Sequence, residues 1–321
     1  MATSGDVLGG PVPPAGGVAP DAPLMECSFA WQGLSAWGSA VHATFWVALE
    51  QPGPWGRDAL VESRLDAELG ARWGGAASDA GGRLLLMRAP GHHVAEEDFA
   101  HRRVLVAGGL SGSAWLLEGT AESEDQFDAL PWEQIALGDR DAVLAACPWL
   151  APAEGPVLLV CTNAKRDRCC ALRGRPIVQE LAEAGLAVWE CSHTGGHRFA
   201  PTGVVLPLGQ VVGRLTAELG RAVLDAAASG RFAVGTLSEV HDRGSSHLPP
   251  REQAAVSWVR AHEGETDPAA LVVVGSDGTV TVQHADGRTW ELVVDKVLGE
   301  DLPESCGKPG KPAATWGVRL A

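Results

Sequence analysis

The sequence has no apolar stretch long enough to cross a bilayer, because no run approaches the ~18 residues that a membrane-spanning helix needs. Residues 1–24 also lack the basic start and apolar core of a secretory signal, and they are rich in Gly, Pro and Ala. We therefore expect a disordered leader over residues 1–24, in a soluble, cytoplasmic protein that has no membrane partner.

Basic residues are scarce as well. The chain has 25 Lys and Arg against 40 Asp and Glu, which gives a formal net charge of −15. Phosphate-rich partners would be repelled overall, so we expect no nucleic-acid partner. The sequence also lacks a GxGxxG fingerprint in a strand–helix context, which argues against a bound dinucleotide.

With 321 residues, the chain is too long for one comfortable hydrophobic core, and its pattern predicts an α/β fold with two domains. Alternating strand and helix patterns followed by a hairpin are typical of a thioredoxin-like unit. We predict such a unit over residues 25–150. It has no C-x-x-C pair, so we interpret it as degenerate. Its predicted elements are strands at 42–50 and 83–88, a helix at 58–73, and a hairpin at 103–107 and 114–118.

Residues 148–155 form a Pro-containing break, after which the pattern repeats. We predict a second thioredoxin-like domain over residues 151–262, and a β-rich extension with a Gly/Pro-rich tail over 263–321. The predicted elements are strands at 156–160, 187–191 and 203–208, helices at 175–184, 211–228 and 249–262, and a meander at 271–274, 280–284 and 290–294.

The chain has an odd number of cysteines, which argues against a disulfide framework. Four of the seven lie between positions 161 and 191, and this clustering favours metal ligands. We expect Cys191 to pack in the core. The remaining three are interpreted as structural, with the alternative that Cys306 covers a bound group. The seven are Cys27, Cys147, Cys161, Cys169, Cys170, Cys191 and Cys306.

Two loops of the second domain carry candidate ligands. Cys161 and Cys170 follow its first strand, and His193 and His197 follow its second. These strands are expected to be parallel neighbours, so both loops should emerge at the same end of the sheet. Iron–sulfur clusters bind thiolates, and imidazole can replace thiolate on one iron. The two glycines between the histidines are atypical of a helical HExxH zinc site.

The segments VCTNAKRDRCC and WECSHTGGHRFAPTGVVLPLG, together with EQPGPWGRDAL at residues 50–60, resemble the sucrase/ferredoxin-like family over roughly residues 27–310. The resemblance implies a thioredoxin-type, ferredoxin-like domain in which C-x8-C and H-x3-H pairs bind a [2Fe–2S] cluster. The implied ligands are Cys161, Cys170, His193 and His197. No paired-carboxylate signature suggests sugar chemistry.

The resulting prediction is a single-electron carrier or a component of an oxidoreductase system, served by separate redox donor and acceptor proteins. Basic residues near the cysteines either offset the charge of the cluster or dock an acidic redox partner. These residues are Lys165, Arg166, Arg168, Arg173 and Arg175.

Three alternatives stay open. Cys169 rather than Cys170 could be the second thiolate ligand. The four residues could form a structural Cys2His2 zinc module, although eight residues between the cysteines is a wide spacing for zinc. The protein could also be a thiol oxidoreductase that uses Cys169 or Cys170 as the nucleophile.

Overall fold

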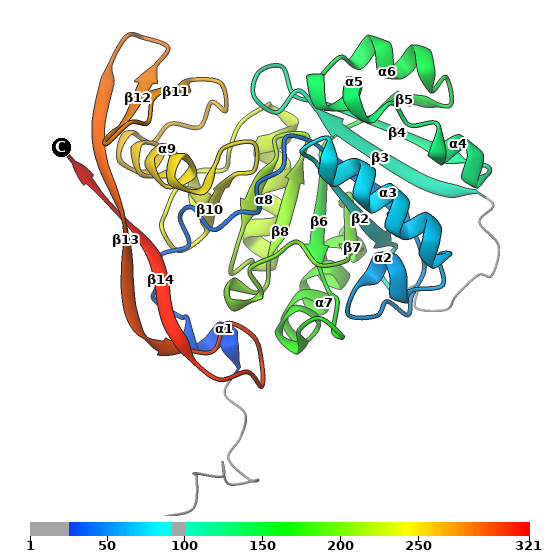
Figure 1. Ribbon diagram of the computed structural model, residues 1–321, viewed down its shortest axis with the longest axis horizontal. Helices are drawn as coiled ribbons and strands as arrows, with labels where there is room; N and C mark the ends of the chain where they lie inside the picture. Colours follow the sequence, from blue (N-terminus) through cyan, green and yellow to red (C-terminus); the bar gives the residue numbers. More distant parts are fainter. Residues whose placement is uncertain (1–25, 92–100) are drawn as a thin grey trace, which may run out of the picture.

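The structure is a computed structural model that describes residues 26–91 and 101–321. It contains a ten-stranded mixed sheet and a separate four-stranded sheet (Figure 1). The α/β class predicted from the sequence is therefore confirmed. The predicted leader over residues 1–24 lies outside the described residues.

The large sheet runs through both predicted halves of the chain. Its strands, in spatial order, are β10 (Asp242–Ser245), β9 (Gln210–Val212), β8 (Gly203–Leu206), β6 (Val157–Cys161), β7 (Val188–Cys191), β2 (Arg83–Arg88), β1 (Trp46–Glu50), β3 (Arg102–Gly108), β4 (Trp115–Ala121) and β5 (Leu150–Pro152).

The two halves of this sheet have the same strand order. In the first half the order is β2–β1–β3–β4, and in the second it is β7–β6–β8–β9. In each half the first two strands are parallel and the third is antiparallel to the first. The halves meet where β2 and β7 pair antiparallel. The order of elements along the chain agrees with the predicted strand, helix, strand and hairpin, while the thioredoxin-like identity of each half stays a prediction.

Strand alternation separates the core into layers, because successive side chains of a strand point to opposite faces. In β6, Leu158 and Val160 contact the cluster of apolar residues beneath the helices, whereas Leu159 and Cys161 face the opposite side.

The helices are α1 (Cys27–Ala30), α2 (Ala59–Glu62), α3 (Ala67–Asp79), α4 (Glu124–Asp128), α5 (Trp132–Leu137), α6 (Arg140–Ala146), α7 (Arg168–Glu183), α8 (Ala217–Ala228) and α9 (Pro250–Glu263), with 3-10 turns η1 (His197–Phe199) and η2 (Val234–Thr236).

The four-stranded sheet packs on α9 and consists of β11 (Leu271–Gly275), β12 (Val280–His284), β13 (Thr289–Leu302) and β14 (Lys311–Leu320). The prediction of a Gly/Pro-rich tail is wrong here, because residues 311–320 form a long strand that pairs with β13. The tip of this hairpin returns to α1 (Figure 1).

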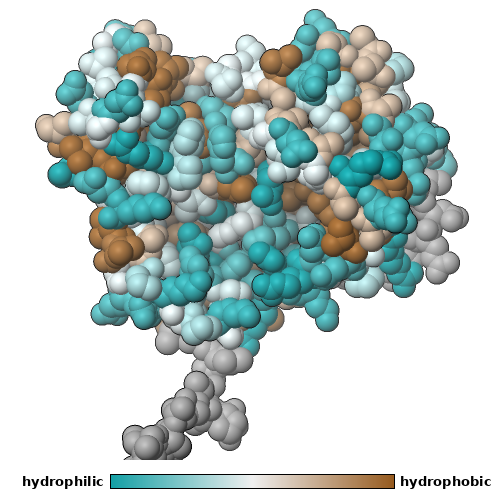
Figure 2. All heavy atoms as spheres, in the orientation of Figure 1, coloured by the Kyte–Doolittle hydropathy of each residue, from teal (hydrophilic) through white to brown (hydrophobic). Residues whose placement is uncertain are grey.

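Hydrophilic side chains cover most of the face in Figure 2, and hydrophobic ones form separate groups, some of which lie over the four-stranded sheet at the left. Exposed apolar residues of this sheet include Val272, Val274 and Leu298. Within the described part of the chain, no helix is both long and apolar enough to span a membrane.

Three predicted helices have different bounds in the structure. The predicted helix over 58–73 is divided into α2 (Ala59–Glu62) and α3 (Ala67–Asp79). Helix α7 begins at Arg168, not at 175, so Cys169 and Cys170 belong to its first turn and not to a loop. The predicted helix over 211–228 is divided, because residues 210–212 form β9 and α8 begins at Ala217. Thr216 caps α8 by accepting a hydrogen bond from the Leu219 N–H, which fixes that start.

Candidate metal centre

The candidate centre lies where two parallel strands end. Strand β6 ends at Cys161 and β7 ends at Cys191, and these two residues are partners in the register. The loops after both strands therefore emerge at the same edge of the sheet, as predicted. The first loop leads into α7 through Asp167, whose carboxylate accepts a hydrogen bond from the Cys169 N–H and caps the helix.

Helix α7 approaches the end of β6 very closely. A Cβ at Gly174 would lie 2.8 Å from the Cys161 carbonyl oxygen, a distance that real Cβ atoms do not show. The absence of a side chain at this position lets the first turn of α7 pack directly on the strand end. Cys170 is thereby held beside Cys161, and both thiols are fully buried.

The structure brings three of the four predicted ligands into one group. The ligand atoms of Cys161, Cys170 and His193 all lie within 4.8 Å of one another. His197 is not part of that group, but its ring centroid is 5.1 Å from that of His193. His193 is half-buried, and the His197 side chain is 14% exposed. The four residues thus line one small, largely buried site.

Both imidazoles present an unused nitrogen to the interior. The Nδ1 atoms of His193 and His197 are buried and have no hydrogen-bond partner. Buried polar atoms normally have a partner, so these two neighbouring nitrogens are available to a group that binds between them. The other nitrogen of His197, Nε2, faces the Asp167 carboxylate at 3.8 Å.

The loop that carries the histidines depends on two consecutive glycines with positive φ. Gly195 has φ 81° and Gly196 has φ 67°, a backbone conformation that side chains rarely adopt. A Cβ at Gly196 would also overlap the Arg243 guanidinium. Arg243 is buried and donates a hydrogen bond to the Gly195 carbonyl at 3.0 Å. This contact fixes the turn between the two imidazoles.

The two buried thiols differ in their affinity for protons. The hydrogen bond from the Cys170 thiol lowers the pKa of Cys161, burial opposes this shift, and the His193 imidazole adds to the lowering. The same hydrogen bond, and then burial, raise the pKa of Cys170. Burial also lowers the pKa of His197. A thiolate and neutral imidazoles are the forms that bind metals.

A buried ion pair stabilises the strand ends around this site. Arg88 donates to the Glu190 carboxylate at 3.0 and 2.7 Å, and the Thr162 hydroxyl donates to the same oxygen at 2.7 Å. The Arg88 and Glu190 side chains are only 4% and 3% exposed. Because Thr162 follows Cys161 and Glu190 precedes Cys191, the pair fixes the ends of β2, β6 and β7 together.

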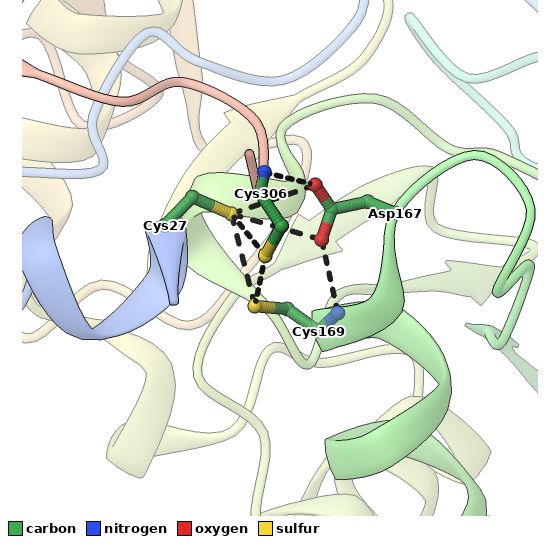
Figure 3. A group of neighbouring side chains, drawn as sticks. All are labelled: Cys27, Asp167, Cys169 and Cys306. Atoms are coloured by element: carbon green, nitrogen blue, oxygen red, sulfur yellow. Dashed lines mark hydrogen bonds between the residues drawn. The ribbon is translucent and has the colours of Figure 1, made fainter. Parts of the chain in front are cut away.

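Adjacent cysteines on α7 serve two different groups. Cys170 lies beside Cys161, whereas the Cys169 thiol lies with Cys27, Cys306 and Asp167 (Figure 3). Sequence reasoning interpreted Cys27 and Cys306 as structural and did not find this second group. The only sequence signal was the position of Cys306 in an SCGKP turn, because the residues come from segments that are far apart in the chain.

Two cavities flank the loop after β6. One, of about 200 Å³, is lined by residues that include Arg57, Arg83, Arg166 and His193. The other, of about 310 Å³, is lined in part by Arg88, Lys165 and Arg175. Of the remaining predicted basic residues, Arg173 pairs with Glu26 at 2.9 Å, and Arg168 interacts with Cys306.

Comparison with models of protein families identifies the family of this chain. The family model described as "Sucrase/ferredoxin-like" matches residues 37–237, well over half of the chain. The chain belongs to the sucrase/ferredoxin-like family. The matched region includes Cys161, Cys170 and both histidines. Neither curated proteins nor solved structures gave a significant match.

Proposed function

We propose that this sucrase/ferredoxin-like protein carries single electrons on a [2Fe–2S] cluster bound by Cys161, Cys170, His193 and His197. The observation that carries the proposal is the pair of buried thiols facing two imidazoles whose buried Nδ1 atoms have no partner. Two thiolates with two imidazoles form a donor set that [2Fe–2S] clusters accept. When bound, the cluster supplies reversible uptake of one electron.

The position of His197 weighs against a single zinc ion bound by all four residues. Around a single tetrahedral zinc ion, with metal–sulfur and metal–nitrogen distances of ~2.3 and ~2.1 Å, all ligand atoms lie within about 4 Å of each other. His197 falls outside the 4.8 Å group that the other three residues form. The alternative of a structural Cys2His2 zinc module is therefore less well supported.

Asp167 is proposed to orient one ligand. Its carboxylate lies 3.8 Å from His197 Nε2, which favours the tautomer with the proton on Nε2 and leaves Nδ1 available for iron. Burial lowers the pKa of His197, so the imidazole is neutral and ready to bind. Asp167 also caps α7, and it thereby connects the position of the thiols with that of the imidazole.

The cavity beside His193 is the proposed docking site for an acidic redox partner. Burial lowers the pKa of Arg83, and the neighbouring Arg166 lowers it further, because two guanidinium groups repel each other. An anionic side chain of a partner would relieve this repulsion. On a protein with a net charge of −15, such a local positive site would orient the encounter and bring the partner to His193.

A thiol oxidoreductase is the second candidate function, and one observation favours it. A hydrogen bond from Cys27 lowers the pKa of Cys169 to about 6, which would increase the thiolate fraction. However, Cys169 is fully buried, so a substrate has no direct access to its sulfur. Electron transfer needs no such access.

Anaerobic purification followed by iron and acid-labile sulfide analysis tests the proposal. We expect about two iron ions and two sulfides per chain and a red-brown protein. A colourless protein that contains zinc at this site would support the zinc module instead. Metal-free protein that turns over disulfide or peroxide with thiols would support the oxidoreductase.

A further inference from the structure

We propose that Cys27, Cys169 and Cys306, together with Asp167, bind a single zinc ion beside the candidate cluster. Figure 3 shows the three sulfurs and the carboxylate pointing toward one another. Their ligand atoms all lie within 4.8 Å, and Cys27 and Cys169 are fully buried. Three thiols and a carboxylate form a donor set typical of zinc.

The sulfur distances fit one tetrahedral ion. Zinc–sulfur bonds of ~2.3 Å at tetrahedral angles place sulfurs about 3.8 Å apart. The Cys27 sulfur lies 3.8 Å from that of Cys169 and 3.7 Å from that of Cys306. The Cys169–Cys306 separation is 3.0 Å and needs to open by less than an ångström. Thiolates that bind different irons of a cluster are held apart by its core, so this compact group favours a mononuclear site.

The carboxylate of this group is held in place before any ion binds. Asp167 accepts hydrogen bonds from the backbone N–H groups of Cys169 at 2.9 Å and Cys306 at 2.8 Å. The Ser305 hydroxyl donates to it at 3.0 Å. The Cys27 sulfur lies 3.7 Å from both of its oxygens. Such contacts orient ligands in metal sites.

The site joins three segments that are remote in sequence. Cys27 begins α1, Cys169 lies in the first turn of α7, and Cys306 lies in the loop between β13 and β14. Cys27 and Cys306 both fall outside residues 37–237, the region that matches the family. An ion here would fix the start of the described chain and the C-terminal hairpin against the α7 turn that also carries Cys170. The Cys27 thiol also points to the His197 carbonyl at 3.8 Å.

A Cys169–Cys306 disulfide is the competing use of these thiols. It would explain the closeness of those two sulfurs, but it would leave the third buried thiol and the converging carboxylate unexplained. The zinc site uses all four groups. The two uses differ in metal content and in the number of free thiols, so an experiment can separate them.

The experiment measures zinc, iron and sulfide per chain in full-length protein purified anaerobically under reducing conditions. We expect about one zinc in the wild type. It should fall at least tenfold in Cys27→Ser and Cys306→Ser, while iron and sulfide stay unchanged. Cys147→Ser is the matched control, because Cys147 is also a fully buried thiol but packs in the core of the first half. Cys161→Ser is the reciprocal control, which should lose iron and keep zinc.

Cobalt gives a second readout that does not depend on how well the variants fold. Wild-type protein depleted of zinc and reloaded with Co²⁺ should show thiolate-to-cobalt charge-transfer absorption and visible bands of a tetrahedral ion. Zinc-free wild-type protein, zinc that persists in Cys306→Ser, or a Cys169–Cys306 disulfide found by mass spectrometry in the reduced preparation would each overturn the proposal. Iron in this position, lost with Cys27→Ser, would overturn it as well.

Discussion

The two halves of the ten-stranded sheet share a strand order but end their parallel strands in different chemistry. In the second half, β6 and β7 end at Cys161 and Cys191, and the following segments bring Cys170 and His193 to the same edge. In the first half, β1 and β2 end at Glu50 and Arg88. The strand topology thus provides a place for a binding site in each half. The side chains in the segments that follow the two parallel strands decide whether a metal or cofactor binds there.

The first half instead contributes to the support of that site. Arg88, at the end of β2, stacks on Trp55 at 4.1 Å and pairs with Glu190 of β7. Arg57 and Arg83, also from the first half, line the cavity beside His193.

The largest expected effect is loss of the cluster when a proposed thiolate ligand is replaced. Cys161→Ser and Cys170→Ser should each reduce bound iron at least tenfold, because each removes a thiolate that iron requires. His193→Ala and His197→Ala should also lose or destabilise the cluster. Iron analysis and visible absorbance measure the effect.

Two other cysteines serve as controls for this experiment. Cys169→Ser and Cys147→Ser should keep the iron, since their sulfurs belong to the second group and to the core of the first half. If Cys169→Ser loses its colour and Cys170→Ser does not, the thiolate assignment is wrong by one residue.

The next effect concerns the ion pair that joins the halves. Arg88→Met should lower the free energy of unfolding by about 3–5 kcal/mol, because it removes the guanidinium that forms a buried ion pair with the Glu190 carboxylate. Arg221→Met is the matched control. Its partner Glu180 is 58% exposed, and such surface pairs contribute only about 0–1 kcal/mol. Equal losses in the two variants, measured by urea unfolding, would contradict the supporting role of Arg88.

A smaller effect is expected on the reduction potential. All-cysteine plant-type clusters have potentials of about −400 mV, whereas two histidines on one iron raise the value to about −150 mV or above. The wild type should lie in the higher range. His193→Cys or His197→Cys, where the cluster is retained, should lower the potential by at least about 100 mV. Redox titration followed by absorbance measures both values, and an unchanged potential in the variants would contradict histidine ligation.

The smallest effect concerns the basic cavity. Arg57→Ala combined with Arg166→Ala should slow reduction by dithionite, an anion, by a few-fold at low ionic strength. The difference should disappear in ~1 M salt, where charges are screened within about 3 Å. Arg140→Ala, which removes an exposed charge at the start of α6, is the control. Equal slowing at every salt concentration would indicate a structural role for these arginines.

The sequence predicted which two loops meet at the candidate site but missed much of what surrounds them. The meeting of the Cys161 and His193 loops was predictable because parallel neighbouring strands end at one edge. The direction in which the Cys169 side chain points was not predictable. It depends on α7 beginning at Arg168, because adjacent residues of a helix point about 100° apart around its axis. The tail was misread because β14 acquires its structure only through pairing with β13. Cys27 and Cys306 lie beside Cys169 only because of tertiary contacts, and a local sequence pattern does not predict such contacts.

The most direct test of the central claim is pulsed EPR of the one-electron-reduced protein, with and without isotope-labelled histidine. It asks whether nitrogen atoms of histidine are bound to a reduced [2Fe–2S] cluster. The account predicts a paramagnetic signal with couplings from two histidine nitrogens, one of which disappears in His193→Cys. A cluster signal without histidine coupling, or no cluster signal from protein purified anaerobically, would contradict it.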